Sequence, residues 1–262
     1  MIIPIYQADA FTEKLFGGNP AAVCPLEEWL PDTTMQNIAM ENNLAETAFI
    51  VKEKGRYHIR WFTPALEVAL CGHATLAAAH IYMNHLGHNE SQIIFNSKSG
   101  LLRVTMQDDK KLTLDFPADR YERVETIPAA VTEGLKTHVN MLYKGTFDYM
   151  AVVADQKTVE GLIPDFKTIA TLPSRGIIVT AKGDVSDFVS RCFFPQSGID
   201  EDPVTGSAHT LLVPYWSAQL HKQHMTAIQL SARRGHLDCQ LAGDRVLMGG
   251  YAVTYLQGTI NI

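Results

Sequence analysis

Residues 67–80 read EVALCGHATLAAAH, and no charged side chain follows Glu67 in this stretch. Its apolar residues fall on every face of a helix, and a helix of this kind is normally enclosed on all sides. The simplest enclosure is a sheet that curls around the helix. The helix would begin with residues 71–74 (CGHA), small or reactive residues that leave the backbone open to a ligand. We therefore predict a buried helix whose first turn is a site.

The size and charge of the chain limit its class. With 262 residues, the protein is long enough for one large domain or two small ones. Hydrophobic residues make up 46% and charged residues 19%, as in ordinary globular proteins. The net charge of −6 argues against a nucleic-acid partner and against an anionic membrane surface.

The N-terminus and the cysteines predict a cytoplasmic protein. MIIPIYQADAF lacks the basic segment and cleavage site of a signal peptide, and we interpret it as a first strand. Cys24, Cys71, Cys192 and Cys239 form no CxxC pair, which favours reduced thiols over a disulfide frame or structural zinc. Residues 68–89 carry no charge, but their histidines, asparagines and glycines favour a core helix over a membrane span.

Strands and helices alternate along the chain. Residues 2–11, 46–52 and 58–64 are rich in β-branched and aromatic side chains and are predicted to be strands. Residues 31–43 (PDTTMQNIAMENN) open with a helix-start signal and carry apolar side chains at helical spacing.

The second half of the chain resembles the first. In the first half, FTP at 62–64 is followed by GHA at 72–74 and an apolar helix; in the second, FP at 194–195 is followed by GSA at 206–208 and another apolar helix. Such an internal repeat predicts two similar lobes. We place them at residues 1–118, joined by the strand 252–262, and at residues 119–251.

Each lobe then contains a buried helix with small residues in its first turn. The backbone N–H groups of a first turn have no partner inside the helix and carry partial positive charge. Two such turns facing one cleft would hold a small anion such as a carboxylate. The residues concerned are Gly72, His73 and Ala74 in one lobe and Gly206, Ser207 and Ala208 in the other.

Four segments together resemble the signature of a known family. They are FGGNPAAV (16–23), NLAETAF (43–49), the FTP…CGHAT run (62–75) and DPVTGSAH (202–209). In this order and spacing they are similar to the phenazine-biosynthesis F-like (PhzF-like) isomerases. The resemblance implies an α/β fold of the diaminopimelate-epimerase type: two pseudo-symmetric lobes, each a mixed, mostly antiparallel sheet wrapped around a central helix. It also implies a homodimer and a reaction that needs no metal or organic cofactor.

The same resemblance implies general acid–base isomerisation of a small carboxylic acid, which in the best-known family member is a dihydro-hydroxyanthranilate. One carboxyl group would take a proton from one carbon and return it to another, a task that suits a buried glutamate because burial raises its pKa. The implied catalytic residues are Glu46, His73 and Asp202. The implied substrate-binding residues are Gly72, Ala74, Gly206, Ser207, Ala208 and Asn19, the last within the turn-like GGNP at 17–20.

Other interpretations of these residues remain open. On the sequence alone, Glu46 can be a solvated surface acid, His73 a core histidine, and Asp202 a turn residue before Pro203. A thiol-based epimerase of the same fold would use Cys71, but its second thiol is replaced by Thr205, whose hydroxyl is a poor substitute for a thiolate. A carboxylate-binding protein without activity is the remaining alternative. The histidines at 80, 85, 88, 221 and 224 complete no familiar metal-ligand pattern.

Overall fold

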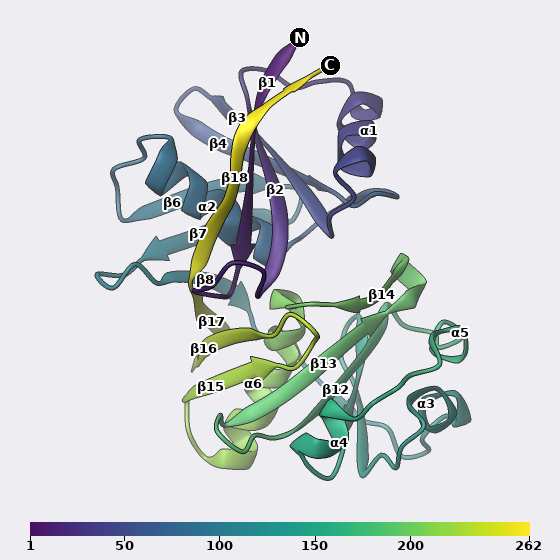
Figure 1. Ribbon diagram of the computed structural model, residues 1–262. Helices are drawn as coiled ribbons and strands as arrows, with labels where there is room; N and C mark the ends of the chain where they lie inside the picture. The colour runs from purple at the N-terminus through teal and green to yellow at the C-terminus, as the bar shows by residue number, and fades with distance from the viewer. The chain divides into compact units, whose positions relative to one another are not determined.

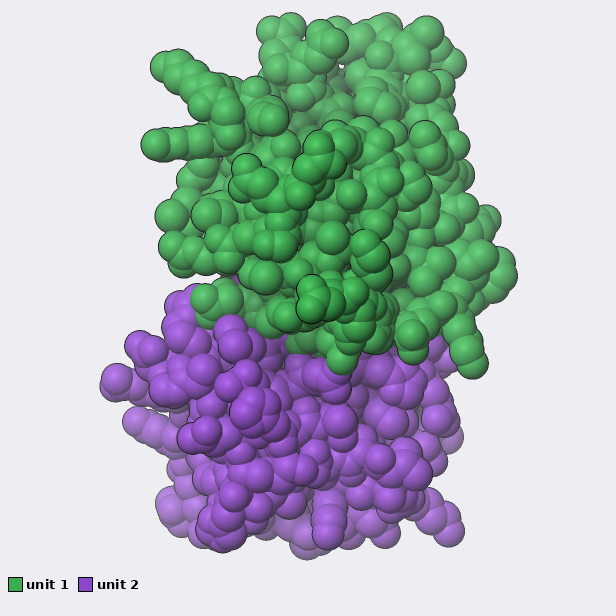
Figure 2. Space-filling model, turned by 90° about the vertical axis from the view of Figure 1, so that its left-hand side faces the viewer, with its two compact units in different colours: residues 1–115, 249–262 green, residues 116–248 purple.

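The computed structural model describes residues 1–262, which divide into two compact units. Unit 1 comprises residues 1–115 and 249–262, and unit 2 comprises residues 116–248 (Figure 2). The chain passes from unit 1 to unit 2 within β8 (Leu112–Pro117) and returns to unit 1 within β17 (Arg245–Gly250). The last strand of the chain therefore belongs to the same unit as the first.

Unit 1 contains two α-helices and a mixed sheet (Figure 1). Its further elements are β1 (Ile2–Ala10), β2 (Asn19–Leu26), α1 (Asp32–Asn42), β3 (Glu46–Glu53), β4 (Arg56–Phe62), β5 (Glu67–Val68), α2 (Gly72–His85), β6 (Gln92–Ser97), β7 (Gly100–Met106) and β18 (Ala252–Asn261). β18 pairs antiparallel with β1 over nearly its whole length, and this pairing ties the C-terminus to the N-terminal strand.

Unit 2 repeats this plan with four α-helices in place of two. Its elements are β9 (Glu122–Arg123), α3 (Ala129–Leu135), β10 (Met141–Lys144), β11 (Asp148–Val152), α4 (Gln156–Glu160), α5 (Phe166–Ile169), β12 (Gly176–Lys182), β13 (Phe188–Phe194), the 3-10 turn Pro195–Ser197, β14 (Ile199–Asp202), α6 (Gly206–Leu220), β15 (His224–Gln229) and β16 (Gly235–Ala242).

The strand pairings of the two units match one for one. In unit 1, β1–β2 is antiparallel, β2–β3 parallel, β3–β4 antiparallel, β4–β6 parallel and β6–β7 antiparallel. In unit 2, the corresponding pairs β10–β11, β11–β12, β12–β13, β13–β15 and β15–β16 have the same directions in the same order. The internal repeat predicted from the sequence is thus confirmed as two pseudo-symmetric lobes.

The central helix of each lobe is α2 or α6. Ten of the 14 residues of α2 are buried, and the helix packs against β1, β2, β3, β7 and β18. α6 packs in the same way against β11, β15 and β16. Because each helix is enclosed by strands on several sides, its sequence can be apolar all round. Neither these helices nor any other in the structure is long and apolar enough to cross a bilayer.

Pro214 lies inside α6 without ending it. A proline has no N–H to donate to the carbonyl four residues earlier, which here belongs to Thr210. That carbonyl accepts a hydrogen bond from the backbone N–H of Asp119 instead, at 3.0 Å. The proline therefore leaves an acceptor on the helix surface to which the 119 segment is attached.

Candidate functional site

The first group of predicted site residues lies in unit 1, where β3 and α2 begin. Glu46 is the first residue of β3, and His73 lies in the first turn of α2. Glu46 Oε2 and His73 Nε2 are 3.2 Å apart, and the two side chains are 12% and 4% exposed. These two atoms are in close approach but make no hydrogen bond of good geometry. Glu46 is therefore not a solvated surface acid.

The protonation state of His73 follows from its other neighbour. The amide Nδ2 of Asn19 lies 3.1 Å from His73 Nδ1 and donates to it, so Nδ1 is the acceptor nitrogen. In a neutral imidazole the proton is then on Nε2, the nitrogen that faces Glu46. Burial lowers the pKa of His73 from 6.5 to about 3, so the ring is neutral at physiological pH. The carboxyl group of Glu46 thus faces an uncharged N–H donor.

Asn19 is held by a turn that needs a glycine. Gly18 has a φ of +59°, and a Cβ there would lie 2.0 Å from the carbonyl oxygen of Ala10. The close approach brings the chain into β2 with Asn19 opposite Ala10 in the β1–β2 ladder. Asn19 is fully buried. The GGNP segment therefore has a definite structural task, which is to present the Asn19 amide to His73.

Cys71 is the N-cap residue of α2, and its Sγ lies 3.5 Å from His73 Nδ1. The candidate ligand atoms of Glu46, Cys71 and His73 all lie within 4.8 Å of one another, which is the spacing of a metal site. However, the thiol neighbours Nδ1 and the carboxylate neighbours Nε2, on opposite sides of the ring. A single ion on either nitrogen would point away from one of the other two ligands. The thiol and the carboxylate therefore flank different ring nitrogens of His73.

The second group of predicted residues lies in unit 2, at the start of α6. Asp202 is buried at the end of β14, and its Oδ2 accepts a hydrogen bond from Thr205 Oγ1 at 2.6 Å. Thr205 is the N-cap residue of α6, but its side chain makes no cap hydrogen bond to the helix. Gln229 joins the two, since its Nε2 donates to the Asp202 carbonyl and its Oε1 accepts from the Thr205 N–H. Asp202 therefore takes part in the turn before α6, which is the role of a turn residue before Pro203 considered above.

Ser207 is the second residue of α6, and it has a charged neighbour that was not predicted from the sequence. Nη2 of Arg175 donates to Ser207 Oγ at 3.1 Å, and the same guanidinium is paired with the buried carboxylate of Asp148. Arg175 comes directly before β12, in the segment SRG at 174–176. A lone arginine in a loop carries no signal from sequence alone, and for that reason sequence reasoning missed it.

The structure thus brings the predicted residues together as two groups. Glu46, His73 and Asn19 are in contact within unit 1, with Gly72 and Ala74 in the same helix turn as His73. Asp202, Gly206, Ser207 and Ala208 surround the start of α6 in unit 2. Cys71 and Thr205, the positions of the thiol pair in the rival hypothesis, are the N-cap residues of α2 and α6, which confirms that they are equivalent in the two lobes.

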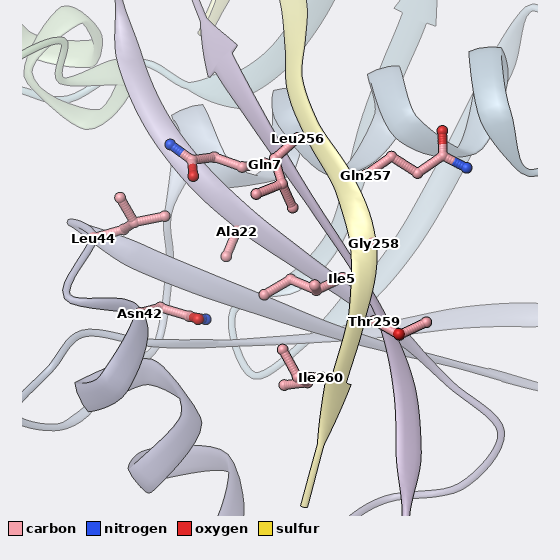
Figure 3. A pocket seen from close by; sticks show the side chains of 10 residues that line it. All are labelled: Ile5, Gln7, Ala22, Asn42, Leu44, Leu256, Gln257, Gly258, Thr259 and Ile260. Carbon is pink, nitrogen blue, oxygen red and sulfur yellow. The ribbon is translucent and has the colours of Figure 1, made fainter.

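A separate apolar groove lies elsewhere on unit 1 and has a volume of about 310 Å³ (Figure 3). Its walls come from β1, β2, β18 and the end of α1. The lining residues are Ile5, Gln7, Ala22, Asn42, Leu44, Leu256, Gln257, Gly258, Thr259 and Ile260. None of the predicted site residues is among them, so this groove is distinct from the Glu46–His73 group.

Comparison with known proteins identifies the class to which this fold and these residues belong. The family model for phenazine biosynthesis-like proteins matches residues 8–258. An isomerase of Pseudomonas aeruginosa is 48% identical over the whole of both chains. A crystal structure of a PhzF-family protein from Enterococcus faecalis superposes with a TM-score of 0.96 at 46% identity, again over the whole of both chains. A hydroxyproline epimerase from Agrobacterium vitis, at 9% identity and a TM-score of 0.64, shares the fold alone.

The protein is accordingly an isomerase of the epimerase-like α/β fold. More particularly, the chain belongs to the phenazine biosynthesis-like (PhzF) family.

Proposed function

We propose that the protein is a cofactor-independent isomerase that moves a proton between two carbons of a small cyclic or amino carboxylic acid. Glu46 is the proposed acid–base group, which removes the proton from one carbon and returns it to another. The single observation that carries this proposal is the buried approach of Glu46 to the neutral His73, with the Asn19 amide on the other ring nitrogen.

The neutral state of His73 matters for this chemistry. A charged imidazolium beside Glu46 would stabilise the carboxylate and weaken it as a base. A neutral Nε2–H donates one hydrogen bond and leaves the remaining lone pairs of the carboxylate for a substrate proton. Asn19 supports this state because its Nδ2 donor keeps the proton of His73 on Nε2. We therefore assign His73 the task of orienting Glu46 and assisting the movement of the proton.

The residues at the start of α6 are proposed to bind the substrate in the same reaction. The Ser207 hydroxyl and first-turn backbone N–H groups would donate hydrogen bonds to the carboxylate, since both central helices lack a side-chain cap. The N–H groups concerned are those of Gly72, Ala74, Gly206 and Ala208. Asp202 would accept a hydrogen bond from an amino or hydroxyl group of the substrate. We further propose that the protein acts as a homodimer located in the cytoplasm.

The thiol-based alternative finds less support. Its second position is occupied by Thr205, whose hydroxyl hydrogen is given to Asp202 and whose oxygen accepts from Gln229 Nε2. The Asp202 carboxylate is too weak a base to convert this hydroxyl to an alkoxide, so Thr205 is a structural link and not a proton acceptor for carbon.

The proposal is tested by proton NMR in D₂O with a panel of small cyclic and amino carboxylic acids, including the dihydro-hydroxyanthranilate. Wild type, Glu46→Gln and Glu53→Gln are compared; Glu53 is the exposed glutamate at the other end of β3 and serves as the matched control. We expect rearrangement or deuterium uptake with wild type and Glu53→Gln but not with Glu46→Gln. Equal activity of the Glu46→Gln variant would refute the mechanism, and binding without turnover of any acid by wild type would favour a carboxylate-binding protein.

A further inference from the structure

Arg175 forms a bidentate ion pair with a carboxylate and, unlike the other arginines that do so, has a donor nitrogen that makes no hydrogen bond within the protein. Its Nε donates to Asp148 Oδ1 at 3.0 Å, and its Nη2 donates to Asp148 Oδ2. Arg191, also in unit 2, pairs with Glu201 in the same way, at 2.7 and 2.8 Å. Both guanidinium groups lie over a phenylalanine ring, of Phe194 and Phe193 respectively. The two arginines therefore form a natural comparison.

The remaining donors of the two arginines are used differently. Nη1 of Arg191 donates to the backbone carbonyls of Val159 and Leu162. These hydrogen bonds attach the guanidinium to the loop after α4, so Nη1 of Arg191 is not available to a ligand. Nη1 of Arg175 makes no hydrogen bond within the protein, and its second Nη2 hydrogen points to Ser207. A guanidinium has five N–H donors in a fixed plane, so two of those of Arg175 remain available. The Arg175 side chain is also about a third exposed (35%), whereas that of Arg191 is 12% exposed.

The position of Arg175 is fixed from several sides. The guanidinium contacts the rings of both Phe194 and Phe147, at 5.0 and 5.8 Å from their centroids. The neighbouring residue, Gly176, has no room for a Cβ, which would lie 2.2 Å from the Phe194 ring and 2.4 Å from a backbone carbonyl. Asp148 is almost fully buried and anchors the other edge. A side chain held this firmly keeps its free donors pointing in one direction.

The hydrogen bond to Ser207 has a directional consequence. A serine hydroxyl has one hydrogen to donate and accepts through its oxygen. Because Arg175 occupies the oxygen as a donor, the hydroxyl hydrogen of Ser207 is directed to an acceptor elsewhere. The Ser207 carbonyl is already used, since it accepts from Thr210 Oγ1 at 2.7 Å. Ser207 is thereby set as a donor beside the positive charge of Arg175.

We propose that Arg175 is a substrate-binding residue that selects a carboxylate: it sets the hydroxyl of Ser207 as a donor and binds the same carboxylate through its own Nη1. Asp148 is the positioning residue that holds the guanidinium in place. This inference rests on the proposed function, because it concerns the substrate of that site. It specifies the substrate class as an anion with two acceptor oxygens, which an uncharged amide or ester of the same shape does not match.

The test compares an acid with its amide. Anthranilate is a stable cyclic amino carboxylate, and anthranilamide has nearly the same shape without the charge. Dissociation constants for both are measured by isothermal titration with wild type, Arg175→Gln, Arg175→Lys and the control Arg191→Gln. We expect Arg175→Gln to weaken anthranilate binding by about tenfold or more and to leave anthranilamide binding unchanged, because a charge-assisted pair is lost. Arg175→Lys should keep part of the preference for anthranilate over anthranilamide, and Arg191→Gln should keep all of it.

A second comparison separates direct binding from a folding defect. In Arg175→Gln the buried Asp148 is left without its partner, so the double variant Arg175→Gln/Asp148→Asn removes both charges and is measured beside it. In a Ser207→Ala background the effect of Arg175→Gln should be at least threefold smaller, since part of it acts through Ser207. Equal loss of affinity for acid and amide would overturn the proposal, as would a wild-type protein without preference for the acid.

The proposal about Arg175 and the proposal about Glu46 can fail separately. If Glu46→Gln abolishes proton transfer while Arg175→Gln keeps the preference for the acid, the inference about Arg175 fails alone. If Glu46→Gln retains turnover while Arg175→Gln loses the preference, the acid–base proposal fails and carboxylate selection stands.

Discussion

His209 should make unit 2 sensitive to acid, and the size of the effect can be worked out from its surroundings. The residue is fully buried in α6, its Nδ1–H donates to the Thr205 carbonyl at 2.8 Å, and its Nε2 has no partner. Burial lowers the pKa of His209 from 6.5 to about 4, partly offset by the Thr205 carbonyl. Between pH 6.5 and 4, His209 is protonated in the unfolded chain but neutral in the folded protein. The free energy of unfolding is therefore unaffected by His209 above pH 6.5 and falls as the pH approaches 4.

Each pKa unit corresponds to about 1.4 kcal/mol, so the full effect of His209 is about 3 kcal/mol at pH 4 and roughly 2 kcal/mol at pH 5. The buried His73 and the half-buried His80 have lowered pKa values as well, so the acid sensitivity of the wild type contains more than one contribution. The variant His209→Asn isolates one of them. Its amide nitrogen can take the place of Nδ1 toward Thr205, but it does not titrate.

The assay is urea unfolding at pH 7.5, 6, 5 and 4.5, followed by the ¹⁹F signal of fluorinated Trp216. This ring stacks on Phe188, which in turn contacts His209, so the signal reports on the right part of unit 2. At pH 7.5 the variant should be less stable by about 1–3 kcal/mol because of its smaller side chain. Toward pH 4.5 the difference should shrink or reverse by roughly 2–3 kcal/mol. If both proteins lose stability in parallel, the assignment of a buried, neutral His209 is wrong.

Three further substitutions test how the two groups are held. Asn19→Ala should lower turnover by about ten- to a hundredfold, because His73 loses the donor that fixes its tautomer, and ¹⁵N NMR of the imidazole should show the proton no longer confined to Nε2. Gly18→Ala should destabilise unit 1 by about 2 kcal/mol or more in urea unfolding, since its Cβ meets the Ala10 carbonyl and its φ is positive. Pro214→Ala should bring no stabilisation in the same assay despite the better helix propensity of alanine, because its new N–H would compete for an acceptor that is already in use; a gain near 3 kcal/mol would contradict this.

The sequence predicted the elements that carry strong periodic or compositional signals. The apolar run at 71–83 is α2, the segment 31–43 is α1, and the strands predicted at 2–11, 46–52 and 58–64 are β1, β3 and β4. The repeat was visible because the same residue types precede both central helices. These signals are local, so they survive in a single sequence.

β2 was not predicted, because its sequence, NPAAVCPL, contains two prolines, and prolines argue against a central strand. The pairing shows how it is accommodated: β2 joins β1 on one side and β3 on the other, and the strand begins at a turn that needs Gly18. Tertiary pairing here outweighs local preference.

The candidate site was predicted only where a family motif covered it. Glu46, His73, Asp202 and Ser207 belong to such motifs, whereas Arg175 and Asp148 come from other parts of unit 2 and are joined to Ser207 by the fold. The contact of Asn19 with His73 spans 54 residues of sequence, so no local pattern could reveal it. Side-chain contacts between distant segments depend in part on the sheet register, since a one-residue shift of β3 would turn the Glu46 side chain to the opposite face of the sheet.

Whether Glu46 moves the substrate proton is decided by the turnover number of Glu46→Gln on the first acid that wild type isomerises, measured beside Cys71→Ser. We expect Glu46→Gln to lose at least about a thousandfold in kcat with its substrate affinity changed by only a few fold, while Cys71→Ser stays within about tenfold of wild type. A Glu46→Gln variant that keeps more than about a tenth of the wild-type kcat would show that Glu46 is not the acid–base group, and the loss of activity in Cys71→Ser alone would assign the proton transfer to the thiol.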